Sequence, residues 1–134
     1  MEFGNTKIQS STSSSVVLPS VIQERPVQFD IWEELDELSR GAEWQGRIVH
    51  TVLAQCPDLQ ITLTATKART YFLRHHNRGW ICVQTVQGHI RKHAEDKLFD
   101  LPQGKALVLE PGITHDVETL KNSAFLLIVA PPAA

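Results

Sequence analysis

Short apolar stretches separated by turn residues fill most of the chain after residue 46, and no helical pattern interrupts them. In the clearest stretch, residues 59–66, apolar side chains alternate with glutamine and threonine, which is the pattern of a half-buried β-strand. The other expected strands are Arg47–Ala54, Tyr71–Leu73, Trp80–Val86, Lys97–Leu101, Ala106–Leu109 and Ala124–Ala130. Because these short strands follow one another without helices, the pattern predicts an all-β protein, an antiparallel sandwich or barrel.

The segment after Gly88 is rich in charged residues, and we interpret it as a polar hairpin. His89 and His93 flank Arg91 and Lys92 in this segment. Alternating polar side chains are typical of a surface that faces water, so we expect both histidines to be solvated.

One helix is expected, from Asp30 to Gly41. Asp30 suits the N-cap, acidic residues follow it in the first turns, and Gly41 can end the helix in the left-handed conformation. Residues 1–24 begin with a serine- and threonine-rich run and continue with apolar residues that could form an edge strand. We therefore predict a tail or edge strand at residues 1–24 and one β domain at residues 25–134.

The composition is that of an ordinary globular domain, with 42% apolar and 21% charged residues and a formal net charge of −2. This charge gives no reason to expect nucleic acid or an anionic membrane as a partner. No apolar run is long enough to span a bilayer, and the first residues do not resemble a signal peptide. We expect the cytoplasm as the location.

Residues 104–115 resemble the second sequence motif of the cupin superfamily. They contain a glycine turn at Gly104, an apolar strand, a Pro-Gly turn and then His115, three residues after Gly112. The proline directly precedes Gly112 instead of lying two residues before it. Thr119 stands where that motif usually has asparagine.

The first cupin motif is incomplete in this chain. Counting back seven residues from Gly88 places Ile81 where the motif has a glutamate. The histidine pair of the motif is either His75 with Asn77 or Arg74 with His76, so one histidine of the usual two is present in either register. The resemblance extends from about Trp44 to Val129.

The resemblance implies a jelly-roll β-barrel with one short N-terminal helix, commonly a homodimer. It also implies a pocket in which the family often holds zinc, iron, manganese or nickel. The candidate metal ligands are His75, His76 and His115, with His50, Gln84 or Asn77 as alternatives for a third ligand. Tyr71, Trp80, Ile81 and Gln84 are the candidate residues of the ligand pocket.

Three functions agree with this reading. The first is a cupin-fold protein whose barrel binds a small molecule, with or without a divalent metal held by histidines. The second is a metal-dependent enzyme, a dioxygenase or an isomerase, against which the missing glutamate counts. The third is a non-catalytic binding or regulatory module, which a barrel filled with side chains would favour. The fold does not decide among these three.

Overall fold

The computed structural model describes residues 25–41, 46–75 and 78–131, and structural statements refer to these residues. Within them, one helix, α1 (Ile31–Arg40), precedes nine strands. The strands are β2 (Ile48–Cys56), β3 (Leu59–Thr66), β4 (Tyr71–His75), β5 (Trp80–Gln87), β6 (His89–Ala94), β7 (Lys97–Pro102), β8 (Ala106–Leu109), β9 (His115–Thr119) and β10 (Ser123–Ala130). The predicted all-β fold class is confirmed. The predicted tail or edge strand at residues 1–24 lies outside the described residues.

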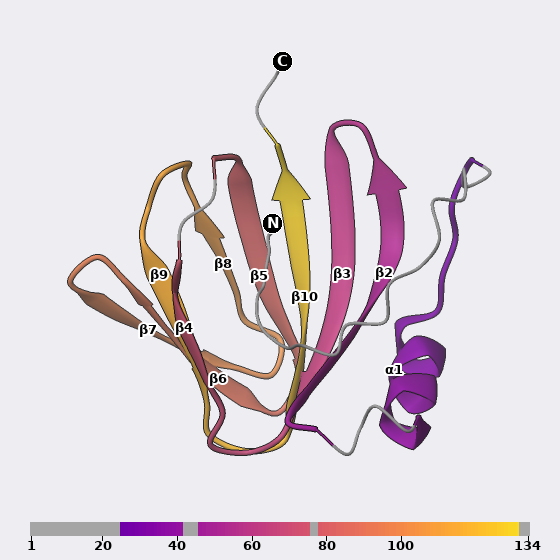
Figure 1. Ribbon diagram of the computed structural model, residues 1–134, viewed down its shortest axis with the longest axis horizontal. Helices are drawn as coiled ribbons and strands as arrows, with labels where there is room; N and C mark the ends of the chain where they lie inside the picture. Colours follow the sequence, from indigo (N-terminus) through magenta and orange to yellow (C-terminus); the bar gives the residue numbers. More distant parts are fainter. Residues whose placement is uncertain (1–24, 42–45, 76–77, 132–134) are drawn as a thin grey trace.

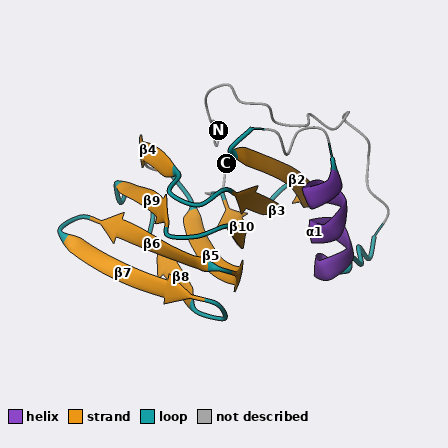
Figure 2. Cartoon of the chain, turned by 90° about the horizontal axis from the view of Figure 1, so that it is seen from below, coloured by secondary structure: helices purple, strands orange, loops and turns teal. Residues whose placement is uncertain are grey.

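The strands form two antiparallel sheets that face each other, with α1 on the outside of β2 and β3 (Figures 1 and 2). The five-stranded sheet has the order β2-β3-β10-β5-β8, and the four-stranded sheet has the order β4-β9-β6-β7. The last strand, β10, lies between β3 and β5, so strands far apart in the sequence are neighbours. The two sheets form two layers, and we call the region between them the barrel interior.

The barrel interior contains an apolar core to which both sheets contribute. Its buried members are Ile81, Val83, Ile90, Ala94, Leu101, Leu109, Val117, Phe125 and Val129. Members that share a strand are separated by two or four positions, as for Ile81 and Val83, which is expected when one face of a sheet points inward.

A second apolar core lies on the outer face of the five-stranded sheet, under α1. Leu35 and Leu38 of α1 pack there with apolar residues of β2, β3 and β10, among them Leu63 and Ala65. The apolar face of β3 therefore turns outward to the helix. The opposite face of β3 carries threonines, and Thr64, which pairs with Phe125, faces the barrel interior.

The start of α1 agrees with the sequence prediction, and its end does not. The Asp30 carboxylate accepts hydrogen bonds from the backbone N–H groups of Trp32 and Glu33 at 3.0 and 3.1 Å. Gly41 is extended, with φ −73° and ψ 159°, so the expected left-handed stop was wrong. A bond from the Gly41 N–H to the carbonyl of Leu38 closes the last turn, and the chain leaves the helix in an extended conformation.

Two strands of the four-stranded sheet, β6 and β9, were not among the predicted strands. Charged and polar residues interrupt both, so apolar alternation is weak in them. The turn before β6 depends on Gly88, which has φ +90°. A side chain at this position would meet the backbone of Asn122 and Ser123, so the turn requires glycine for both conformation and space.

Candidate functional site

Strand β6 places a lysine in the barrel interior. Ile90, Lys92 and Ala94 alternate along the strand, and Ile90 and Ala94 belong to the interior core. Since side chains two apart on a strand share a face, Lys92 points inward with them. Its exposed fraction is 2%, and it is the largest side chain that is almost completely buried among the described residues.

Burial changes the proton affinity of this lysine. Removal from water disfavours the charged form and lowers the pKa of Lys92 from 10.5 to about 7, although the negative charge of Asp116 opposes this shift. Near neutral pH the side chain is therefore divided between ammonium and neutral amine. Charged groups in protein interiors are usually paired or serve a function, so this residue is the strongest indication of a site.

His115 lies on the same inner face, on the adjacent strand β9. It is 2% exposed and lies two residues before Val117 of the interior core. The register pairs His115 with Ala94 and Val117 with Lys92. His115 and Lys92 are therefore diagonal neighbours, with Cα atoms about 7–8 Å apart, a separation that a long side chain can bridge.

Of the other predicted metal ligands, His75 is the register partner of His115 across β4 and β9. The register of this pair shifts by one residue between Phe72 and His75, where β4 contains a bulge. His76 lies outside the described residues. The structure thus brings the backbones of His75 and His115 together, and the three-histidine site stays a prediction.

The predicted pocket residues divide between the two faces of the sheets. Ile81 is 4% exposed and belongs to the interior core. Tyr71 and Trp80 are 55% and 54% exposed, and Gln84 is exposed as well. On β5, Trp80 and Gln84 lie on the face opposite to Ile81 and Val83, which is the outer face of the sheet. Of the four, only Ile81 is thus placed to line the barrel interior.

The inner face of the five-stranded sheet is partly polar. Thr64 is 6% exposed, and its register partners are Phe125 on β10 and His50 on β2. Burial lowers the pKa of His50, which favours the neutral imidazole at neutral pH. Phe72 from the facing sheet packs edge-to-face on Phe125, with ring centroids 6.1 Å apart. An aromatic pair and the side chains of Thr64 and His50 therefore contribute to the lining of the barrel interior.

The described residues around His115 do not by themselves form a divalent-metal site. No group of three histidine, cysteine, aspartate or glutamate side chains suited to hold a metal is found in the described part of the chain. Ile81 occupies the position at which the family resemblance implies a carboxylate. Lys92 also adds a cationic group beside His115, where a metal dication would need anionic or neutral donors.

On the outer face of the same sheet, Asp116 joins two side chains. It accepts a hydrogen bond from the Tyr71 hydroxyl at 2.6 Å and lies 2.8 Å from Nδ1 of His93. Burial raises the pKa of Asp116, but the hydrogen bonds from Tyr71 and His93 outweigh this effect and lower the pKa overall. Asp116 thus orients the imidazole of His93, not that of His115, and its hydrogen bonds are directed away from the barrel interior.

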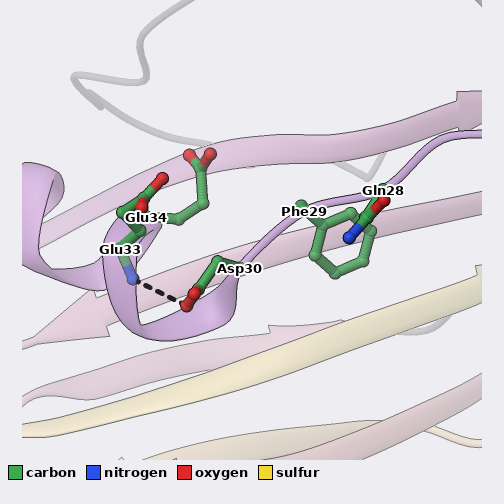
Figure 3. Close-up of a pocket in the computed structure, with 5 residues that line it drawn as sticks. All are labelled: Gln28, Phe29, Asp30, Glu33 and Glu34. Carbon is green, nitrogen blue, oxygen red and sulfur yellow. Dashed lines mark hydrogen bonds between the residues drawn. The ribbon is translucent and has the colours of Figure 1, made fainter.

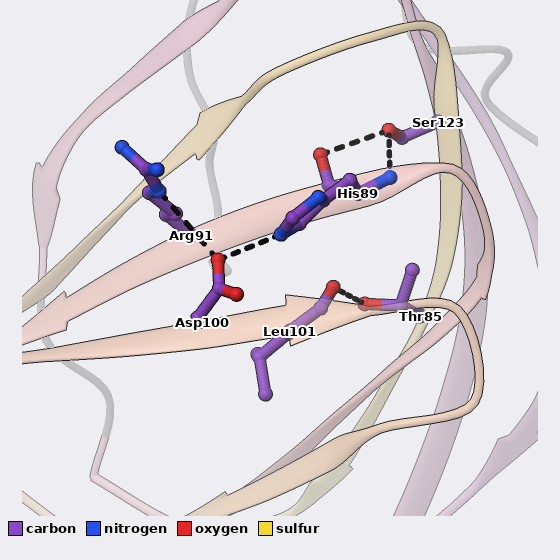
Figure 4. Close-up of polar contacts among 6 residues, drawn as sticks. All are labelled: Thr85, His89, Arg91, Asp100, Leu101 and Ser123. Atoms are coloured by element: carbon purple, nitrogen blue, oxygen red, sulfur yellow. Dashed lines mark hydrogen bonds and ion pairs between the residues drawn. The ribbon is translucent and has the colours of Figure 1, made fainter.

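A second polar cluster on this outer face involves the neighbouring strand β7 (Figure 4). Asp100 lies 2.6 Å from Nε2 of His89 and 3.5 Å from Nε of Arg91. Hydrogen bonds from His89 and then Arg91 lower the pKa of Asp100. Asp100 is exposed, and His89 and Arg91 are partly exposed. Such surface pairs contribute little to stability, so we assign this cluster to the surface of the hairpin.

Two surface depressions in the described residues lie away from the barrel interior. The first lies at the start of α1 and is lined by Gln28, Phe29, Asp30, Glu33 and Glu34 (Figure 3). The Asp30 carboxylate caps the helix, and the carboxylates of Glu33 and Glu34 in the first turn complement its dipole. The second is lined by loop residues at 46–47, 67–69 and 122. Within the described chain, no helix is both long and apolar enough to cross a membrane.

Lys92 is the residue that sequence reasoning missed. It was counted with the charged residues of a polar hairpin, and its two histidine neighbours were expected to be solvated. His93 is indeed exposed, and His89 is partly buried. A signal for Lys92 was present, because Ile90 and Ala94 are apolar and lie two residues to either side of it. Read as a strand, residues 90–94 place Lys92 on the apolar face.

Comparison with solved structures shows the fold class of this arrangement. A conserved protein of unknown function from Streptococcus pyogenes has a TM-score of 0.66 at 22% identity, covering 84% of this chain and 93% of that one. A cupin superfamily protein from Desulfitobacterium hafniense has a TM-score of 0.65 at 20% identity, covering 87% and 100%. An RmlC-like cupin from Shewanella frigidimarina has a TM-score of 0.61 at 14% identity, covering 65% and 78%. No protein-family model and no curated protein matches the sequence.

Proposed function

Because this chain has the cupin fold, we propose that it binds a small molecule inside its barrel, against the inner face of β6 and β9. The observation that supports this proposal is the burial of Lys92 beside His115. A barrel that served only as a scaffold would gain stability from apolar residues at these positions, because burying a charged group without a close partner is costly. Polar groups retained in an interior at such a cost are typical of binding sites.

Ligand-observed NMR with a panel of small fragments tests the proposal. The informative variant is Ala94→Leu. Ala94 faces the interior and is the register partner of His115 on the adjacent strand, so a larger side chain there would fill the proposed site. Such a substitution costs about 1–3 kcal/mol of stability, which a thermal melt measures alongside. The control is Gln84→Leu, which enlarges apolar surface on the outer face of β5.

We expect wild type and Gln84→Leu to bind the same fragments and folded Ala94→Leu to bind none of them. Fragments that bind equally to all three proteins lie elsewhere, and that result would contradict a site in the barrel. The metal-dependent enzyme stays a prediction. So do the cytoplasmic location and the metal on His75, His76 and His115.

We also propose a homodimer that uses the outer face of the five-stranded sheet at β5 and β8. Trp80 and Val108 are 54% and 61% exposed there, and Cys82 lies between them as the register partner of Val108. β8 is an edge strand, and two copies related by a twofold axis could pair their edges. Sedimentation of wild type and Val108→Glu tests this, with a dimer expected for the first and a monomer for the second. A monomeric wild type would contradict it.

A further inference from the structure

We propose that the barrel ligand is a small carboxylate, held by the ammonium group of Lys92 in a site that uses no divalent metal. This inference rests on the proposed function, because it names the chemical class of the molecule that the barrel binds. It goes further in assigning to a side chain of the protein the positive charge that a metal would otherwise provide.

The position of Lys92 is the first argument. The side chain is 2% exposed and points into the interior from the middle of β6. Its register partners, Val117 on β9 and Phe99 on β7, are both apolar. An ammonium group in such surroundings lacks the hydration that it has in water, and an incoming anion would restore a favourable partner.

The second argument is that the carboxylate near Lys92, that of Asp116, already has other hydrogen-bond partners. Asp116 attracts the ammonium group. However, Asp116 directly precedes Val117 in the sequence, so its side chain lies on the opposite face of β9. Its carboxylate oxygens are hydrogen-bonded to Tyr71 and His93 on that face. The interior side of the sheet therefore carries a cation, and the charge that offsets it lies on the exterior side.

The third argument comes from the groups that share the inner face. His115 is the diagonal neighbour of Lys92, and an imidazole N–H can donate to a carboxylate oxygen. Thr64 and Thr85 flank Phe125 on the facing sheet, because both are its register partners. The Thr85 hydroxyl donates a hydrogen bond to the carbonyl of Leu101, so its proton is not available to a ligand. Lys92 and His115 thus form the donor side of the site.

The fourth argument is the disagreement with a metal site. A carboxylate ligand at position 81 would attract a metal, and isoleucine stands there. A lysine beside His115 adds positive charge to the same space, which disfavours a dication and favours an anion. The isoleucine at position 81 and the lysine at position 92 thus change the interior potential in the same direction.

Paired probes that differ only in charge test the assignment. We would titrate the protein with propionate and propionamide, and with benzoate and benzamide, at about pH 6, and follow binding by ligand-observed NMR and calorimetry. For wild type we expect each carboxylate to bind about tenfold more tightly than its amide, as for a hydrogen bond to a charged group. Lys92→Met and Lys92→Gln should reduce this preference to about twofold or less. Lys105→Met, which removes an exposed lysine, should leave it unchanged.

The outcomes separate this inference from the proposed function. Equal binding of carboxylate and amide that is still blocked by Ala94→Leu overturns the anion assignment and leaves barrel binding intact. Probe binding that no interior variant affects, or no binding of any probe, overturns both. Inorganic phosphate that displaces the carboxylates through Lys92 overturns the carboxylate class.

A metal titration completes the test. We expect EDTA to leave propionate and benzoate binding unchanged, and we expect Zn²⁺, Mn²⁺ and Ni²⁺ to give no stoichiometric binding in calorimetry. One equivalent of metal bound by wild type and lost in His115→Ala overturns the metal-free site. This readout needs no enzymatic activity.

Discussion

Replacing Lys92 with methionine should make the protein more stable at neutral pH and remove a pH dependence that the wild type shows. Methionine has nearly the shape of lysine without its charge, so the apolar contacts of Ile90, Ala94 and Val117 are kept. The perturbation therefore isolates the free energy of holding an amine in the barrel interior.

The magnitude follows from the pKa of Lys92, which burial lowers from 10.5 to about 7 in the folded protein. Between these two values the unfolded chain binds the proton and the folded protein has released it, so the free energy of unfolding rises with pH. Below about pH 7 both states are protonated, and the folded protein carries the full cost of the buried charge. With 1.36 kcal/mol for each pKa unit, this cost is about 5 kcal/mol.

Urea unfolding of wild type and Lys92→Met at pH 7 and pH 9 measures the effect. The wild type should gain about 2 kcal/mol relative to the variant between these two values, because roughly half of the cost is relieved over that range. All groups other than Lys92 are common to both proteins, so their contributions cancel in the difference. Equal pH dependence of the two proteins would refute the burial of a titrating lysine in the interior.

The other predictions concern separate parts of the structure. His115→Ala should weaken propionate binding by about fivefold through loss of one hydrogen bond, whereas His89→Ala on the hairpin should not; equal affinities in calorimetry would contradict a role for His115. Tyr71→Phe should lower the free energy of unfolding at pH 7 by about 1.5 kcal/mol. This loss should become smaller in strong acid, because hydrogen bonds lower the pKa of Asp116 and the bond from Tyr71 is strongest when Asp116 is ionised. An equal loss at neutral pH and in strong acid would contradict this. Gly88→Ala and Gly104→Ala change glycines with the same φ of +90°, but only Gly88 lacks space for a side chain. Denaturation should show about 1–2 kcal/mol lost for Gly104→Ala and roughly 2 kcal/mol more for Gly88→Ala, and equal losses would contradict the steric argument.

Much of the fold could be predicted from local patterns. The strand at residues 59–66 and that at 106–109 have the bounds that alternation and turn residues indicated. Asp30 caps α1 because a carboxylate at the start of an amphipathic segment satisfies free N–H groups wherever the helix packs. Gly104 and Gly112 have positive φ in turns that were expected there. These features depend on neighbours in the sequence, so the sequence is sufficient to predict them.

Which face of each strand points into the barrel could not be predicted from local patterns. Alternation shows that a strand has two faces, but it does not show which face meets the other sheet. In β3 the apolar face, with Leu63 and Ala65, turns outward because α1 covers that side, and the threonine face turns inward. Sequence alone could not show where the helix would pack.

The candidate site depends on the same tertiary arrangement. Local patterns were enough to indicate an antiparallel β-fold with a capped helix, and they marked His115 as an interior candidate. The burial of Lys92 could not be inferred in this way, because it depends on β6 lying between β7 and β9 with its Ile90–Ala94 face toward the other sheet. Long-range strand pairing sets the register of Lys92 with Val117 and of Ala94 with His115, and local propensities carry no information about it.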